Sequence, residues 1–432
     1  MQYKMLKSII RNIIPYWVRK RKHYLFDLKG KSNEYKIAQL ESAIREKEKV
    51  KVLFIASSLP MWRGQGVYDL LDKDPEFDVR IIISPFARYN QAEALLHTEA
   101  LKKYFADRKL IVPATTDTEF NFEDWFCEFS PDIIFFSQQY YGLYNNLLNI
   151  ENHRDKLHCF IPYALPTVKE QFVYNSPAHN LAWRVYHATS LHLKTAKKQM
   201  GNNAINVRIC GEPDADSFLT DSPKDPWNTI ADGKQRKRII WAPHFSIGHS
   251  GFLCRESFLW LSDAMVALAL KYADSVQFAF KPHPHLHSVL SEYEGWGAEK
   301  TNEYYKKWAT MPNTQLEEGR FQDLFFHSDG MIHDCGSFTG VYLYVNKPVM
   351  FMSDNISQIR RDADDFGLKC IELHYGGKCV DDVERFIKDT ILGGHDPMRE
   401  QRENFYNDYL LPQNGLSFAE NVYNDLKNSL RN

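Results

Sequence analysis

The chain has 432 residues, about the length of two domains, and its 44% hydrophobic content is that of a globular protein, which excludes general disorder. The formal net charge of −2 argues against a protein devoted to nucleic-acid binding, because neutralising phosphates requires a basic excess. Seven scattered cysteines without a C-x-x-C spacing fit reduced thiols in the cytoplasm better than a disulfide framework or a zinc site.

Residues 1–48 are predicted to form a basic amphipathic segment. Residues 1–31 carry nine lysines and arginines against one acid, Asp27, and their apolar residues recur at three- and four-residue steps. A helix with an apolar stripe beside a cationic face suits an anionic membrane, so we expect a cytoplasmic protein that binds the inner face of the cell membrane. The alternative is a terminal helix packed on the body of the protein. No run of 18 apolar residues predicts a membrane span.

Residues 49–210 are predicted to form an acceptor-side α/β domain. Four apolar runs are typical of buried parallel strands, and segments of helical composition lie between them; the strands are expected at 50–57, 78–84, 132–137 and 156–163. Two loops that follow strands offer polar contacts for a ligand, with Arg63 in the first loop and Tyr163 and Lys169 in the second. A simple strand–helix turn would explain the first loop almost as well.

Residues 211–238 are rich in proline, aspartate, serine and glycine and show no sustained periodicity, which predicts an interdomain linker. Residues 239–432 are predicted to form a second α/β domain that binds a nucleotide donor and ends in a helix. Its strands are expected at 238–244, 276–284, 330–334 and 347–352, and an apolar helix at 258–272. The architecture is therefore two Rossmann-like domains facing a cleft.

Polar groups follow three successive strands of this second domain. They are Pro243-His244, the run Lys281 to His285, and the run His333 to Ser337. Because the carboxyl ends of parallel strands meet at one edge of a sheet, we expect these groups to form one site. His283 is the candidate general base, since its flanking prolines fix the backbone and imidazole titrates near neutrality. The H-P-H-L-H run lacks an assignable carboxylate or cysteine partner, so no metal site is predicted.

The segment 333–348 has the pattern of a strand, a small-residue turn and a helix start. Gly336 permits close approach, and the hydroxyls of Ser337 and Thr339 would lie beside free N–H groups, which is typical of a phosphate site. The alternative is that one of these hydroxyls only caps the helix. The chain has no GxxxxGK[ST] loop and no G-x-G-x-x-G after a strand, which argues against a P-loop NTPase and an NAD-dependent dehydrogenase.

Four segments together resemble the CDP-glycerol glycerophosphotransferases of teichoic acid and capsule synthesis. They are WAPHF (241–245), FKPHP (280–284), FQDLFFHSDGMIHDCGSFTGVYLYVNKPVMFM (321–352) and YLLPQNGLSFAENVYNDL (409–426). The resemblance implies a GT-B-like fold, peripheral membrane attachment, and transfer of glycerol phosphate from CDP-glycerol to a polyol, saccharide or lipid-linked acceptor with release of CMP. Cys335-Gly336 stands where the family has Tyr-Ser, and Pro162-Tyr163 where it has a His-Gly element.

The resemblance also implies site residues. His283 would be the catalytic histidine, and Asp334, Ser337 and Phe338 would match the donor loop. The full expected set is catalytic His283 and Asp334, donor contacts His244, Lys281, Gly336, Ser337, Phe338 and Thr339, and acceptor-side Arg63, Tyr163 and Lys169. No cofactor is expected beyond the nucleotide-activated donor. Two alternatives stay open: a GT-B nucleotide-sugar glycosyltransferase of surface polysaccharide synthesis, and an inactive protein that binds a nucleotide or polysaccharide.

Overall fold

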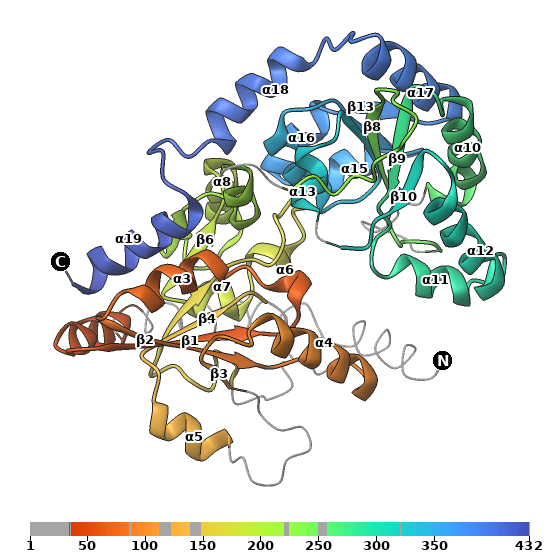
Figure 1. Ribbon diagram of the computed structural model, residues 1–432. Coiled ribbons are helices and arrows are strands. Elements are labelled where there is room, and N and C mark those ends of the chain that lie inside the picture. The colour runs from red at the N-terminus through yellow and green to blue at the C-terminus, as the bar shows by residue number, and fades with distance from the viewer. Residues whose placement is uncertain are drawn as a thin grey trace, which may run out of the picture. The chain divides into compact units, whose positions relative to one another are not determined.

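The computed structural model describes residues 34, 36–85, 89–111, 122–138, 148–219, 224–248, 257–319 and 321–431. These residues fold into two compact units, each built on one parallel β-sheet covered by helices (Figure 1). The basic segment predicted at residues 1–31 lies outside the described residues, so its membrane role stays a prediction. Within the described part of the chain, no helix is both long and apolar enough to cross a membrane.

Unit 1 comprises Met1–Ala164, Glu170–Pro213 and Phe418–Asn432. Its described residues form a seven-stranded parallel sheet in the order β3-β2-β1-β4-β5-β6-β7. The strands are β1 (Val50–Ala56), β2 (Phe77–Ile83), β3 (Leu110–Ile111), β4 (Ile133–Phe136), β5 (Leu157–Phe160), β6 (Arg184–His187) and β7 (Val207–Ile209). The helices are η1 (Leu59–Met61), α3 (Gln65–Lys73), α4 (Gln91–Tyr104), α5 (Phe122–Phe129), α6 (Gln171–Tyr174), α7 (Pro177–Leu181), α8 (Ser190–Gln199) and α19 (Phe418–Leu430).

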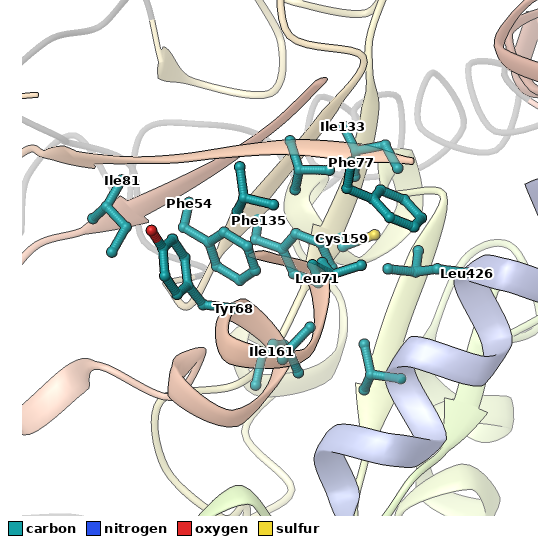
Figure 2. Packing of buried hydrophobic residues seen from close by; sticks show 14 of the residues in the cluster. Phe54, Tyr68, Leu71, Phe77, Ile81, Ile133, Phe135, Cys159, Ile161 and Leu426 are labelled. Carbon is teal, nitrogen blue, oxygen red and sulfur yellow. The ribbon is translucent and has the colours of Figure 1, made fainter. Parts of the chain in front are cut away.

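The sheet of unit 1 is buried on both faces, because successive side chains of a strand point to opposite sides. Phe54 of β1 packs in a cluster with residues of α3 and α19, and the next residue, Ile55, packs in a second cluster with residues of α5 to α8. Figure 2 shows Leu426 of α19 beside Leu71 and Phe77 in the first cluster. The continuous apolar runs of the sequence therefore become central strands covered on both sides.

Unit 2 comprises Leu165–Lys169 and Asp214–Ser417, and its described residues form a six-stranded parallel sheet in the order β10-β9-β8-β11-β12-β13. The strands are β8 (Lys237–Ala242), β9 (Val276–Phe280), β10 (Thr314–Leu316), β11 (Gly330–His333), β12 (Val349–Met352) and β13 (Tyr375–Gly377). The helices are η3 (Pro213–Ala215, across the unit boundary), α9 (Asp216–Leu219), α10 (Phe258–Lys271), α11 (Leu286–Glu292), α12 (Gly297–Thr310), α13 (Gln322–Phe326), α14 (Phe338–Val341), η5 (Tyr342–Val345), α15 (Ile356–Asp362), α16 (Asp365–Glu372), α17 (Val380–Arg385), η6 (Phe386–Leu392), α18 (Arg399–Phe405) and η7 (Tyr406–Leu410).

An aromatic cluster around Trp241 forms the centre of unit 2. The indole of Trp241 is fully buried and lies 5.7 Å from the ring of Phe258, 5.0 Å from that of Phe280 and 5.3 Å from that of Trp308. These rings join β8 and β9 to α10 and α12, and offset or edge-on aromatic contacts add to the free energy gained by burial. The ends of β8 and β9 are thereby held firmly where the candidate site begins.

The two units divide the chain differently from the predicted domains. Most of the predicted linker belongs to unit 2, because Trp227 is buried there and the backbone N–H of Asn228 donates to Oε1 of Gln315 at 2.8 Å. The carboxyl-terminal helix α19, predicted to end the second domain, belongs to unit 1, because its apolar face completes the first cluster. The prediction of two α/β units, each with a parallel sheet, is confirmed. The compact units differ from the predicted domains at these two boundaries.

Candidate functional site

The candidate site lies where the strand order of unit 2 reverses. From β8 the chain builds outward through β9 and β10, then returns to the other side of β8 with β11, β12 and β13. The carboxyl ends of β8 and β11 therefore flank the topological switch point, the usual ligand position in an open parallel sheet. His244 follows β8, Asp334 and Cys335 follow β11, and Lys281 to His285 follow the neighbouring β9. The structure thus brings the three predicted strand ends together.

Asp334 spans this switch point. Its side chain is fully buried, and its Oδ1 accepts a hydrogen bond from the backbone N–H of His244 at 2.6 Å. Its Oδ2 accepts from the backbone N–H of Ser257 at 2.8 Å and from the Ser257 hydroxyl at 2.7 Å. Burial raises the pKa of the Asp334 carboxyl to about 6, and the hydrogen bonds from Ser257 and His244 act in the opposite direction. With both oxygens occupied, Asp334 joins the loop after β8 to the start of α10, which favours a positioning role over a chemical one.

Three histidine rings surround Phe245 at this edge of the sheet. The ring of Phe245 lies 4.4 Å from that of His244, 4.4 Å from that of His283 and 5.5 Å from that of His285. The rings of His244 and His283 lie 5.1 Å apart. Because β9 ends at Phe280 and α11 begins at Leu286, the third histidine of the H-P-H-L-H run is separated from this group. That residue, His287, lies on α11 with its Nε2 2.9 Å from Oδ1 of Asn302.

The hydrogen bonds of His283 decide which of its nitrogens carries the proton. The backbone N–H of His285 donates to Nδ1 of His283 at 3.1 Å, so Nδ1 is an acceptor and the neutral ring carries its proton on Nε2. Burial lowers the pKa of the His283 imidazole to about 3, and His285 and Lys281 act in the same direction. In this tautomer Nε2–H can donate a hydrogen bond but cannot take up a proton. Nε2–H of His283 is therefore available as a hydrogen-bond donor, and the role of general base stays a prediction.

Lys281 is directed into the protein. Its side chain is buried, and its Nζ donates to the backbone carbonyl of Gly319 at 2.7 Å. Burial lowers the pKa of the Lys281 ammonium, and Glu317 and Glu318 partly oppose that shift. Lys281 therefore braces the segment that follows β10. Its predicted contact with a donor phosphate stays a prediction.

The loop after β11 is ordered mainly by its own backbone. The carbonyl of Cys335 accepts from the backbone N–H of Phe338 at 3.2 Å and from the hydroxyl of Thr339 at 3.2 Å. Thr339 is buried, whereas Ser337 is exposed and its side chain makes no capping hydrogen bond; its Oγ lies 3.1 Å from Sγ of Cys335. The helix that follows, α14, has four residues and continues directly as η5. Ser337 is thus the exposed member of this loop, and Gly336 beside it is half-buried.

Phe338 and Gly340 hold this loop against the body of unit 2. The ring of Phe338 lies 5.4 Å from that of Phe321 and 5.0 Å from that of Phe325, which places it in an aromatic cluster. A Cβ on Gly340 would come within 2.6 Å of side-chain atoms of Leu165 and Phe366, so only glycine fits this close approach. Phe338 and Thr339, both predicted to contact the donor, therefore support the turn in this structure.

The three predicted acceptor-side residues fall in different units. Arg63 follows η1 in unit 1 and its Nη1 donates to the carbonyl of Trp62 at 3.2 Å, and the backbone N–H of Tyr163 donates to the carbonyl of Ser137 at 3.1 Å. Lys169 belongs to unit 2, where its backbone N–H donates to the carbonyl of Asp362 at 2.9 Å. Arg63 and Tyr163 therefore belong to unit 1, whereas Lys169 belongs to unit 2.

Two residues of the site were missing from the sequence prediction. Phe245 was quoted only as part of WAPHF, yet it contacts all three histidine rings of the cluster. Ser257 directly precedes the apolar run of α10, and a serine in that place is a recognisable helix-start signal. In the part of the chain that the structure describes, no group of three or more His, Cys, Asp or Glu side chains could hold a metal ion.

No protein-family model matches the chain. No curated protein matches it in sequence either. Solved structures do match it in fold. The Staphylococcus aureus MnaA–UDP co-structure has 15% identity and a TM-score of 0.57, over 88% of this chain and 97% of that one. UDP-GlcNAc 2-epimerase from Neisseria meningitidis bound to UDP-GlcNAc has 13% identity and a TM-score of 0.57, over 89% and 100%.

A third similar structure is the wall teichoic acid polymerase TagF, H444N variant soaked with CDPG. It has 14% identity and a TM-score of 0.54, over 96% of this chain and 99% of that one. At such identities the likeness concerns the fold alone. The two parallel sheets and their helices, matched over most of each chain, confirm the predicted GT-B-like fold.

Proposed function

We propose that this protein transfers glycerol phosphate, or a related polyol phosphate, from a CDP-activated donor to a surface-polysaccharide or lipid-linked acceptor. The observation that carries the proposal is the carboxyl edge of the unit 2 sheet around the end of β8. There Nε2–H of His283 follows β9 on one side, and the turn of Gly336 and the exposed Ser337 follows β11 on the other. Hydrogen-bond donors at such a place suit the phosphates of a nucleotide-activated donor. The segments that resemble the CDP-glycerol glycerophosphotransferases and the fold shared with TagF support the same proposal.

The proposed reaction requires donors for the phosphates and one acceptor for a proton. An acceptor hydroxyl oxygen attacks the phosphorus that bears glycerol, the bond from that phosphorus to the bridging oxygen breaks, and CMP leaves with the electron pair. His283, Ser337 and the backbone of Gly336 would stabilise the charge on the phosphoryl oxygens. Because Nε2 of His283 already carries a proton, the hydroxyl proton goes to another group. Within the cluster, the exposed ring of His285, 5.5 Å from that of His283, is our candidate.

A glycosyltransferase that uses a nucleotide sugar is the second candidate, because two of the similar structures contain UDP or UDP-GlcNAc. The two proposals predict different products. Transfer of a polyol phosphate releases CMP, whereas transfer of a sugar from UDP or GDP releases a nucleoside diphosphate.

The proposal is tested by thermal unfolding of the full chain with CDP-glycerol, CDP-ribitol, CMP, UDP and UDP-GlcNAc. Ligand binding to the native state raises its apparent stability, so cytidine ligands should raise the melting temperature of the wild type by a few degrees. His283→Ala and Ser337→Ala should reduce this shift. His395→Ala, which removes an exposed histidine outside the site, should preserve it.

Two other outcomes of the thermal-unfolding experiment would contradict the proposal. A shift confined to UDP ligands, again reduced by His283→Ala, would support the glycosyltransferase and overturn the cytidine donor. No shift with any nucleotide would overturn the donor site itself.

A further inference from the structure

A short segment of the chain after β5 packs in unit 2 rather than in unit 1. Leu165–Lys169 belongs to unit 2, although the chain before it, to Ala164, and the chain after it, from Glu170, belong to unit 1. We call Leu165–Lys169 the strap. The turn after β11 also belongs to unit 2, so contacts between the strap and this turn lie within one unit.

The backbone of the strap is fixed against the start of α16. Val168 forms an antiparallel bridge with Ala363, and the backbone N–H of Asp364 donates to the carbonyl of Thr167 at 3.1 Å. A Cβ on Gly367 would come within 2.0 Å of the carbonyl oxygen of Thr167, so only glycine fits beside the strap at this position. The backbone of Thr167 is therefore held in one place.

The strap also contacts both ends of the turn after β11. Leu165 is buried, and a Cβ on Gly340 would come within 2.6 Å of its Cδ2. Oγ1 of Thr167 donates to the carbonyl of Gly336 at 3.5 Å, which is a long and hence weak hydrogen bond. The same carbonyl accepts from the backbone N–H of Thr339 at 3.3 Å. The carbonyl of Gly336 is thus held from the strap as well as from within the turn.

Holding the carbonyl of Gly336 also sets the direction of the N–H that follows it. The structure has no cis peptide bond among the described residues, and a peptide unit is planar, so the N–H of Ser337 points opposite to the carbonyl of Gly336. The hydroxyl of Thr167 therefore fixes a peptide whose N–H is directed away from the strap. The exposed side chain of Ser337 starts from the same residue. Thr167 thus helps to orient the residue proposed to meet the donor phosphates.

From these contacts we infer that the strap is a positioning element of the donor site and that Thr167 is its positioning residue. Thr167 acts through the carbonyl of Gly336 and does not itself bind the donor. The inference that Thr167 holds the turn depends on unit 2 alone. Its consequence for donor binding rests on the proposed function.

Hydrogen exchange of the full chain without ligand tests whether Thr167 holds the turn. Thr167→Val keeps the shape of the side chain and removes the hydroxyl, so the amides of residues 336–342 should exchange about threefold or more faster than in the wild type. Thr167→Ser keeps the hydroxyl and should exchange like the wild type. Thr310→Val is the matched control, because the exposed Thr310 also donates to a carbonyl, that of Lys306 at 2.9 Å on α12.

Steady-state kinetics of CMP release from CDP-glycerol tests the effect on the donor. In Thr167→Val, KM for CDP-glycerol should rise about threefold to tenfold while kcat stays within about twofold, because the turn binds the donor less well in the ground state and in the transition state alike. A loss of folded enzyme would instead lower the apparent kcat and leave KM unchanged. Thr167→Ser and Thr310→Val should keep the KM of the wild type.

The two measurements separate the possible failures. Unchanged exchange of residues 336–342 in Thr167→Val overturns the inference, and so does a KM that Thr167→Val and Thr167→Ser raise equally. Faster exchange with an unchanged KM limits Thr167 to a structural role and overturns its positioning role. If exchange accelerates but no cytidine ligand binds the wild type, the proposed function fails while Thr167 still holds the turn. If exchange is unchanged and cytidine ligands raise the melting temperature of the wild type, the proposed function stands without the strap.

Discussion

The chemistry available to His283 is set by a backbone N–H rather than by another side chain. In many catalytic sites a carboxylate or carbonyl accepts from Nδ1–H and leaves Nε2 as the base. Here the backbone N–H of His285, the residue that directly precedes α11, donates to Nδ1 at 3.1 Å. The proton is therefore placed on Nε2, and the side chain becomes a neutral hydrogen-bond donor.

This tautomer gives a prediction that distinguishes a donor from a base. The amide nitrogen of glutamine can stand near the position of Nε2 of histidine and donate, but it cannot accept a proton. CMP release by His283→Gln should therefore be about tenfold or more faster than CMP release by His283→Ala, since a hydrogen bond to a charged phosphate contributes that much. The measurement is kcat/KM for CMP release by the two variants.

A direct observation of the ring complements the kinetics. Nitrogen NMR of the full chain should show Nε2 of His283 protonated and Nδ1 unprotonated at neutral pH. If His283→Gln is as slow as His283→Ala and the proton is found on Nδ1, His283 is the base after all. His395, exposed and outside the site, provides the reference signal of an ordinary histidine.

At the scale of single elements, α19 shows how the end of the chain completes the sheet at its beginning. Leu426 and Leu430 are fully buried in the cluster that contains residues of α3, β1 and β2. Figure 2 shows Leu426 in this cluster. Around this apolar face, Lys427 donates to Asp74 and Glu76 at 3.0 and 2.9 Å, and Nε of Arg184 donates to Asp425 at 3.0 Å. These polar pairs fix the orientation of the helix, while burial of the apolar face supplies most of the free energy.

Leu426→Ala should therefore destabilise unit 1. Truncating a fully buried leucine costs about 2–5 kcal/mol, because a cavity remains in addition to the lost burial. Hydrogen exchange should accelerate in the strands of unit 1, such as β1 and β4, and should stay unchanged in β8 and β11 of unit 2. Leu411→Ala, at a leucine that is 39% exposed, is the control and should have little effect. Faster exchange in β8 and β11 after Leu426→Ala would contradict the assignment of α19 to unit 1.

The elements that could be predicted from the sequence are those whose signal is local. The long apolar runs that became β1, β2 and β8 were predicted within two residues of their observed bounds, because strands buried on both faces need no polar alternation. The strand predicted at 276–284 began correctly, but β9 ends at Phe280, before the prolines. By contrast, β6 and β7 are short and carry Arg184 and Arg208, so they were missed. The partner of α19 could not be predicted either, since an amphipathic pattern shows which face is buried and not which sheet covers it.

The candidate site also has features that the sequence could predict and features that it could not. Parallel strands end at one edge, so the meeting of His244, His283 and Asp334 followed from their places after strands. The direction of each side chain did not follow, because it depends on tertiary partners such as the carbonyl of Gly319 for Lys281. Spacing in the sequence therefore predicted where the site lies, while hydrogen-bond geometry decides what each residue in it can do.

At the scale of the whole molecule, buried neutral histidines recur in both units. Burial lowers the pKa of His158 and of His179 to about 3 and that of His374 to about 4, and it lowers the pKa of His187 well below its ordinary value. All four side chains are at most 5% exposed. Such rings can be protonated only when the protein unfolds, so acid should act on the stability of the whole chain.

The sign of this effect follows from proton counting. An unfolded histidine titrates near pH 6.5, so below that pH the unfolded state binds more protons than the folded state, and the free energy of unfolding falls as the pH is lowered toward 4. Each buried histidine should cost about 1.4 kcal/mol of stability at pH 5.5. Asp334 acts in the opposite direction, because its raised pKa lets the folded state bind a proton between pH 6 and 4, but one carboxyl offsets only part of the loss from four imidazoles.

Urea unfolding at pH 7.5 and 5.5, followed by hydrogen exchange in each unit, tests this account. Neither ring nitrogen of His187 has a hydrogen-bond partner among the described residues, and the ring packs against those of Tyr174 and His192. His187→Leu therefore removes one titrating group without leaving a partner unpaired. The variant should lose about 1.4 kcal/mol less than the wild type between the two pH values, and exposed His395→Leu should lose as much as the wild type. An equal loss in all three proteins would mean that His187 is protonated in the native state. The acid sensitivity would then arise from carboxylates at the surface, which lose their ion pairs when they are protonated.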